Sequence, residues 1–144
     1  WKTVMLIAGI MPLALAMDKS GLVGATSDLL LGYLDAKSPL FVLGVLFLAT
    51  SGLGLFMSNT PVAILIMPMA LKLSLALNIS PQACAMTVAI ACSSAFISPL
   101  GSPVNMIVRE PGGYGFLDYL KVGLPLLLIS LSVTLTLTYF FYLR

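Results

Sequence analysis

Two short stretches of neutral polar residues carry the groups in this sequence that could bind ions. The first is Ser58-Asn59-Thr60, and the second covers residues 98–105 and reads Ser-Pro-Leu-Gly-Ser-Pro-Val-Asn. Where such a stretch ends one helix and starts another, free carbonyl groups suit a cation and free N–H groups favour an anion. Hydroxyl and amide side chains add further neutral ligands. Both stretches are therefore candidate ion sites.

Each stretch lies inside a long segment without any charged residue, residues 38–71 for the first and residues 73–108 for the second. No charge in either segment would hold the polar stretch at the water interface. Irregular backbone within the hydrocarbon of a bilayer is tolerated only where it lines a cavity or is buried in protein. A polar break at membrane depth would therefore be a candidate site on physical grounds.

Helix boundaries are predicted at both stretches. Pro61 and Pro103 suit the first turn of a new helix, where the missing N–H costs nothing. The first helix is then expected to end near Met57, with its successor starting near Thr60, and the second to end near Leu100. The alternative is an ordinary turn outside the membrane between two complete spans. It stays open for the first stretch and fits the second less well, because too few residues follow before the next charge.

The overall composition is that of an integral membrane protein. The 144 residues are 60% hydrophobic and 8% charged, with a net charge of +2, no histidine and two cysteines, and the mean hydropathy is +1.10. Soluble domains carry about 25% charged residues. We therefore exclude a soluble enzyme, a disordered tail, a nucleic-acid-binding protein and a disulfide-linked secreted domain. We expect an all-α membrane protein with no cofactor and no catalysed reaction.

The apolar segments predict a single membrane domain. Because the sequence starts at Trp1 and shows no signal peptide, we expect either a part of a longer protein or a chain that begins after processing. In chain order we predict a span at residues 3–17, an interfacial helix at 20–36, a re-entrant hairpin at 39–77 with its tip at 58–60, a broken span at 82–109 with its break at 99–103, and a final span at 117–143.

The absence of acidic residues from the central segments bears on ion coupling. No Asp, Glu or His lies between Ser38 and Val108, whereas proton coupling usually requires an ionisable group within the membrane. A sodium site built from neutral ligands is therefore favoured over a proton relay, although a carboxylate from outside this chain stays possible. Lys72, the one charge in this region, is interpreted as snorkelling to the interface rather than as a counter-ion.

Three motifs, in this order and at these spacings, resemble a known family. They are the Ser-Asn-Thr tripeptide at 58–60, the stretch at 98–105, and a terminal region with Pro-Gly-Gly-Tyr at 111–114 followed by residues 118–125. The set resembles the divalent-anion/sodium symporter (DASS) family, the citrate-transporter-like group of the ion transporter superfamily, and above all its bacterial members. The resemblance covers nearly the whole chain.

This resemblance implies a fold of two inverted repeats, each with a re-entrant hairpin. The chain would be the last part of the second repeat, with the first repeat of the same transporter as a missing partner. A homodimer and a bacterial inner membrane are also implied.

The resemblance also implies site residues. Ser58, Asn59 and Thr60 would form the hairpin tip and, with Pro103 and Asn105, border the carboxylates of a small anionic substrate. A sodium ion would be bound by the Asn59 side-chain oxygen and by backbone carbonyls; these are placed at Gly54, Met57 and Gly101. Some members carry a hydroxyl residue where this chain has Gly54, so here only a carbonyl could serve.

The predicted function is secondary active transport of a small anion, either a di- or tricarboxylate or an inorganic oxyanion such as sulfate. Sodium coupling and alternating access are expected, with the final span as scaffold in the lipid bilayer. Two alternatives stay open: a non-transporting assembly module or truncated half-transporter, and an arsenite or sodium/proton exchanger of the same superfamily.

Overall fold

The computed structural model describes residues 38–143 without a gap, together with residues 1, 4, 5, 8, 9, 12, 15, 16 and 19–21. The described residues are helical wherever they form regular structure, and no strand occurs among them. Most of the predicted span at 3–17, and residues 22–36 of the predicted interfacial helix, lie outside the described residues.

Five α-helices and two short helical turns follow one another from residue 39 onward. They are α3 (Pro39–Gly54), α4 (Asn59–Ala76), α5 (Pro81–Ser93), the 3-10 turn η1 (Pro99–Gly101), α6 (Pro103–Gly112), α7 (Phe116–Thr138) and the π-helical turn η2 (Tyr139–Leu143).

Proline sets the start of three of these helices. Pro39, Pro81 and Pro103 each occupy the first turn of a helix, after a serine at the N-cap. The fixed φ of proline suits this position, and its missing N–H would have no partner there anyway. Local chemistry thus accounts for where α3, α5 and α6 begin.

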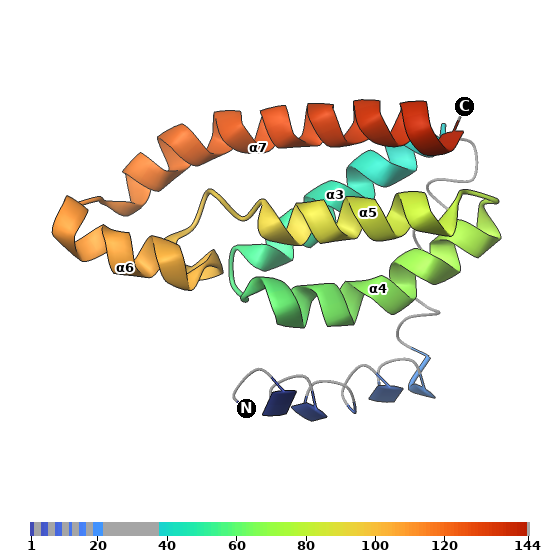
Figure 1. Cartoon of the computed structure of the whole chain (residues 1–144), viewed down its shortest axis with the longest axis horizontal. Helices are drawn as coiled ribbons and strands as arrows, with labels where there is room; N and C mark the ends of the chain where they lie inside the picture. Colours follow the sequence, from blue (N-terminus) through green and yellow to red (C-terminus); the bar gives the residue numbers. More distant parts are fainter. Residues whose placement is uncertain are drawn as a thin grey trace.

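The helices form a bundle in which α5 is central (Figure 1). It packs against α3, α4 and α7. The turn between α3 and α4 and the end of α5 lie at the same end of the bundle, beside α6. The two predicted ion-binding stretches are therefore brought to one end, although they are far apart in sequence.

Two apolar clusters form the core. The larger joins α3, α4 and α5, with Leu43, Val62 and Val88 among its fully buried members. The smaller includes Phe47 of α3 and Leu127 of α7, and connects α7 to the rest of the bundle. The final helix is therefore packed directly on the helices that carry the breaks.

Helix lengths separate complete spans from shorter segments. The 18 residues of α4 and the 27 residues Phe116–Tyr142 are long and apolar enough to cross a membrane, whereas α3 and α5 are shorter apolar helices. At 1.5 Å per residue, the 13 residues of α5 extend about 20 Å, less than the roughly 30 Å of hydrocarbon. By length alone, α5 ends before it could complete a crossing.

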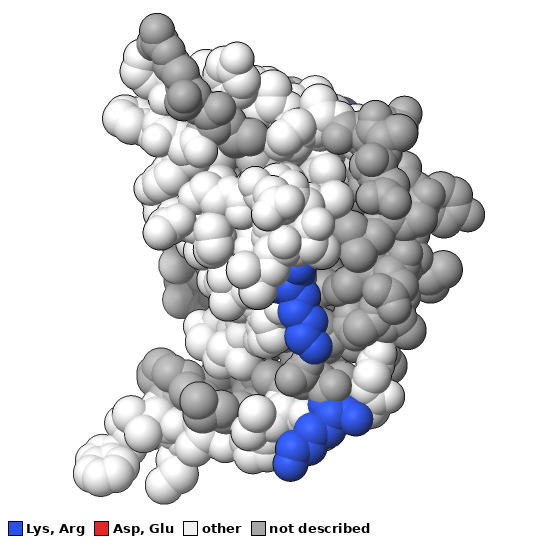
Figure 2. Space-filling view, turned by 90° about the vertical axis from the view of Figure 1, so that its right-hand side faces the viewer, with Lys and Arg blue, Asp and Glu red and all other residues white. Residues whose placement is uncertain are grey.

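The outer surface is apolar too, with large exposed side chains such as Phe41, Leu48, Leu75 and Val122. Figure 2 views the bundle from its right-hand end in Figure 1. Among the residues described, this end shows basic but no acidic side chains, on an otherwise uncharged surface. Glu110 and Asp118 belong to α6 and to the first turn of α7, so they lie at the opposite end. An apolar exterior with charges near its ends suits a lipid or protein surrounding.

The broken span differs from its prediction. We predicted a helix from residue 82 to a break at 99–103, but α5 ends at Ser93 and the irregular segment starts at Ser94. The hydroxyl of Ser94 donates to the carbonyl of Ile90 and contacts a serine of α7, so a partner remote in sequence fixes this end. The helix after the break also extends further than predicted, to Gly112.

Candidate functional site

The hairpin tip is a short turn between two helices. The first helix, α3, ends at Gly54, and Ser58 adopts an extended conformation (φ −70°, ψ 158°) as the N-cap of α4. Asn59 and Thr60 are therefore the first helical residues, and no side chain caps the helix. Their backbone N–H groups have no partner within α4. The tip thus presents the amino end of an 18-residue helix, which favours an anion.

The side-chain oxygen Oδ1 of Asn59 is buried and has no hydrogen-bond partner among the described residues. Burying an unpaired amide oxygen costs free energy, and native structures rarely leave such an atom unsatisfied. A ligand that donates charge or a hydrogen bond to this oxygen would remove the cost. The family resemblance implies a sodium ion at this same atom.

The second break comprises an irregular segment, the turn η1 and the start of α6. Ser98 and Gly101 are buried. Ser102 is extended (φ −141°, ψ 134°) at the N-cap of α6, and α6 begins at Pro103. The amino end of a second helix, also without a side-chain cap, therefore follows directly on a buried loop.

Two glycines bring the breaks into contact. A Cβ atom added at Gly101 would lie 2.6 Å from the Gly54 carbonyl oxygen and 2.8 Å from the Cβ of Ala95. One added at Gly54 would lie 3.1 Å from the same Ala95 Cβ. Only glycine fits at 101 without displacing backbone. The carbonyl oxygen of Gly54 thus lies beside the Cα of Gly101, so two residues with predicted sodium carbonyls are neighbours. The side chain of Met57 is exposed.

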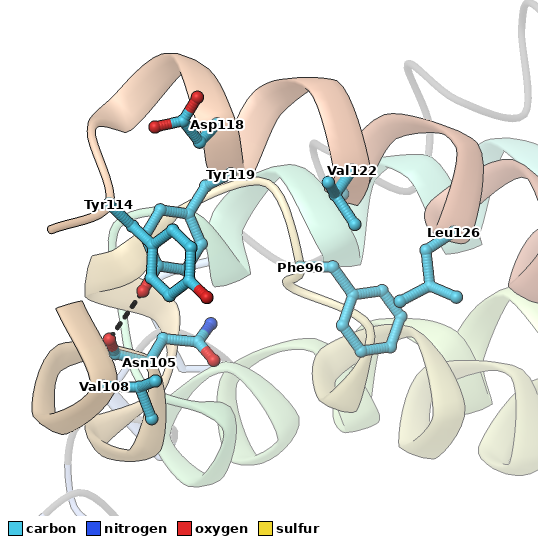
Figure 3. Close-up of a pocket in the computed structure, with 9 residues that line it drawn as sticks. Phe96, Asn105, Val108, Tyr114, Asp118, Tyr119, Val122 and Leu126 are labelled. Carbon is cyan, nitrogen blue, oxygen red and sulfur yellow. Dashed lines mark hydrogen bonds between the residues drawn. The ribbon is translucent and has the colours of Figure 1, made fainter. Parts of the chain in front are cut away.

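Asn105 makes contacts that the sequence did not predict. Its side-chain nitrogen Nδ2 donates to the Ser98 carbonyl over 3.3 Å. Its backbone carbonyl accepts a hydrogen bond of 2.8 Å from the Tyr119 hydroxyl (Figure 3). The amide nitrogen is therefore used within the loop. Within this side chain, only the oxygen Oδ1 is then left for the predicted contact with the substrate.

The final helix supports the second break at two further points. The Oγ atoms of Ser94 and Ser130 lie 2.8 Å apart. A Cβ atom added at Gly123 would lie 2.5 Å from the Phe96 carbonyl oxygen, so α7 lies directly on the irregular backbone. No site role was predicted for Ser94, Phe96 or Ser130, and Gly123 was noted only within the motif at 118–125, although a lone glycine within an apolar helix is a signal for close approach.

A cavity of about 380 Å³ lies between α6, α7 and the irregular segment (Figure 3). Its lining is mainly apolar and consists of Phe96, Asn105, Val108, Tyr114, Asp118, Tyr119, Val122, Gly123 and Leu126. Neither Gly54 nor Gly101 is part of it, so this cavity is separate from the point where the two breaks touch. No group of His, Cys, Asp or Glu that could hold a metal ion occurs among the described residues.

Comparison with known proteins gives a consistent set of relatives. The model of a citrate transporter family matches residues 1–144. An uncharacterized transporter of Escherichia coli, YfbS, is 41% identical over 133 residues, which cover 92% of this chain and 22% of the relative. An uncharacterized transporter of Synechocystis, sll0640, is 34% identical over 134 residues, covering 93% of this chain and 22% of the relative.

A third relative has a more specific name. The sodium-dependent dicarboxylate transporter SdcS of Staphylococcus saprophyticus is 30% identical over 140 residues, which cover 97% of this chain and 27% of the relative. The chain thus spans less than a third of the length of each of these three proteins.

Proposed function

Since this all-α membrane chain belongs to the citrate transporter family, we propose that it supplies the ion-binding part of one of the two repeats of a sodium-coupled transporter for small anions. The observation that carries the proposal is the buried, unpartnered Oδ1 of Asn59. It lies at the start of α4, five residues after a carbonyl that touches the second break.

The sodium ion would be bound by oxygen atoms at the contact of the two breaks. Asn59 would contribute its side-chain oxygen, and Gly54, Met57 and Gly101 their backbone carbonyls. Helix ends and unwound segments that offer carbonyls to a coupling ion are a recurring arrangement in secondary transporters. No acidic side chain belongs to either break, which favours sodium over a proton.

The anion would be bound by the amino ends of α4 and α6. Ser58, Thr60 and Pro103 occupy the first turn or N-cap at these two ends, and Asn105 is the third residue of α6. Neutral N–H and hydroxyl groups suit a di- or tricarboxylate or an inorganic oxyanion such as sulfate. The name of SdcS, a sodium-dependent dicarboxylate transporter, supports the dicarboxylate within this class. The remaining ligands would come from the first repeat.

Alternating access would move the breaks together with the final helix. We predicted the final span as scaffold, but the contacts of Ser94 with Ser130 and of Phe96 with Gly123 pack α7 against the second break. Sliding α7 past this backbone would disrupt a close-packed contact. The packing therefore favours a body in which hairpin, broken helix and α7 move as one. The bacterial inner membrane and the homodimer are proposed from the family resemblance alone.

The test is uptake of labelled succinate, citrate and sulfate into proteoliposomes that contain the full gene product, with and without a sodium gradient. We expect sodium-dependent uptake of one of these anions and its loss in Asn59→Ala. The matched control is Asn78→Gly, because Asn78 is an exposed amide with φ 52°, a conformation that glycine adopts freely. Unchanged uptake by Asn59→Ala would refute the site, and uptake independent of sodium would refute the coupling.

A further inference from the structure

We propose that Tyr119 is a positioning residue that holds the second ion-binding loop in its sodium-competent shape from outside that loop. The inference rests on the proposed function, since it concerns the same site. Tyr119 belongs to the second turn of α7 and lies on neither of the two breaks.

Two hydrogen bonds connect Tyr119 to both ends of the loop. Its hydroxyl donates to the Asn105 carbonyl over 2.8 Å, and the Nδ2 of Asn105 donates to the Ser98 carbonyl over 3.3 Å. Ser98 precedes η1 and Asn105 follows the first residues of α6. The bond between Asn105 and Ser98 therefore closes a loop around Gly101. The bond from Tyr119 to Asn105, which Figure 3 shows, connects this closed loop to α7.

Loop closure matters here because Gly101 has no room to shift toward the hairpin. Even one added carbon would come within 2.6 Å of the Gly54 carbonyl oxygen. On the other side, Gly123 of α7 lies against the backbone of Phe96 and Ile97. The loop is thus held between the backbones of the hairpin and of α7. Loss of the hydrogen bond between Asn105 and Ser98 would change the distance between the Gly54 and Gly101 carbonyls.

The start of α7 is itself held rigidly enough to serve as an anchor. The carboxylate of Asp118 accepts a hydrogen bond of 2.9 Å from the Gly115 N–H and so caps the helix. The ring of Tyr119 meets that of Tyr114 edge-on, with 6.2 Å between centroids. Tyr119 is partly buried while Asp118 and Leu120 beside it are exposed. Its orientation toward Asn105 therefore follows from packing on both sides.

Tyr114 offers a matched control. Its ring lines the same cavity, but its hydroxyl makes no hydrogen bond in the part of the chain that the structure describes. Tyr114→Phe and Tyr119→Phe remove the same atom from neighbouring rings. Only the second removes a bond to the loop, so a difference between the two variants isolates that bond from the loss of a hydroxyl as such.

The experiment uses the purified full gene product and two measurements. Hydrogen–deuterium exchange of residues 98–105 reports the loop, and the sodium dissociation constant fitted to the rise of Tm with sodium concentration reports the ion site. In Tyr119→Phe we expect faster exchange and a rise in that dissociation constant of about fivefold, the factor that corresponds to one net hydrogen bond. In Tyr114→Phe we expect neither.

The outcomes separate this inference from the proposed function. If exchange in Tyr119→Phe is unchanged, or rises equally in Tyr114→Phe, the positioning role is wrong even when the wild type binds sodium. If exchange of residues 98–105 becomes faster in Tyr119→Phe but the sodium dissociation constant does not change, the loop does not position the site and the inference is also wrong. If the wild-type Tm does not respond to sodium at all, the coupling ion of the proposed function fails, and the sodium part of this inference fails with it.

Discussion

The two breaks use similar residues for different purposes. At the hairpin tip the amide oxygen of Asn59 is buried without a hydrogen-bond partner among the described residues. In the second break, by contrast, the amide nitrogen of Asn105 donates to the Ser98 carbonyl, and the hydroxyls of Ser94 and Ser130 are hydrogen-bonded to each other. A polar group that the protein itself satisfies stabilises a shape, whereas one left unsatisfied invites a ligand. The tip is therefore the better candidate for direct ion contact, and the second break is mainly a frame that carries Gly101.

The substitution with the largest expected effect is one that forces the hairpin and the second break apart. Gly101→Ala adds a carbon 2.6 Å from the Gly54 carbonyl oxygen, where the obstacle is backbone. We expect a loss of about 1–3 kcal/mol in the free energy of unfolding and loss of sodium-dependent uptake. Thermal unfolding and uptake of the full gene product measure both.

Gly52→Ala is the control for this substitution. It changes a glycine two residues before Gly54, where an added Cβ meets nothing within 4 Å. Within a helix this change should keep or raise stability, by up to about 1 kcal/mol. If Gly101→Ala behaved like Gly52→Ala, the close contact of the two breaks would not exist in the folded protein.

The unpaired Oδ1 of Asn59 leads to a prediction for the Tm of Asn59→Ala. The direction of the difference from the wild type depends on whether sodium is present. Without sodium, Asn59→Ala should leave the Tm unchanged or raise it, because it removes a buried polar atom that has no partner. With sodium, the wild type should gain stability in proportion to binding, and the variant should gain much less. The measurement is a thermal titration of both proteins with sodium chloride, with choline chloride keeping the ionic strength constant. A variant that is less stable without sodium and equally stabilised by it would show that Asn59 has a structural role only.

How far the sequence predicts this arrangement depends on whether a feature is local. The starts of α3, α5 and α6 lie within one or two residues of their predicted places, because Pro39, Pro81 and Pro103 act within a single turn. The end of α5 was predicted several residues too late. It is fixed by Ser130, which is remote in sequence, and no local pattern around residue 94 carries that information.

The candidate site divides in the same way. Residue type and the family resemblance singled out Gly54, Asn59 and Gly101, and the structure places the first and last of these in contact. Their role toward sodium stays a prediction. Tyr119 was noted only within the motif at 118–125, because its hydrogen bond to Asn105 becomes visible only when the path of the loop is known.

The smallest expected effect concerns the hydrogen bond between Ser94 and Ser130, which connects the second break to α7. A double-mutant cycle measures it. The Oγ atoms of Ser94 and Ser130 are 2.8 Å apart, and the Ser94 hydroxyl also reaches the Ile90 carbonyl. Each single change to alanine should cost about 0.5–1.5 kcal/mol. The double variant should cost less than the sum of the two by a few tenths to about 1 kcal/mol, because the shared bond is lost only once. Sodium affinity should change little in all three variants, since the pair holds α7 to the break without touching the hairpin tip. Strict additivity in the unfolding free energies would mean that the two hydroxyls do not interact, and the contact of α7 with the second break would then rest on Gly123 and Tyr119 instead.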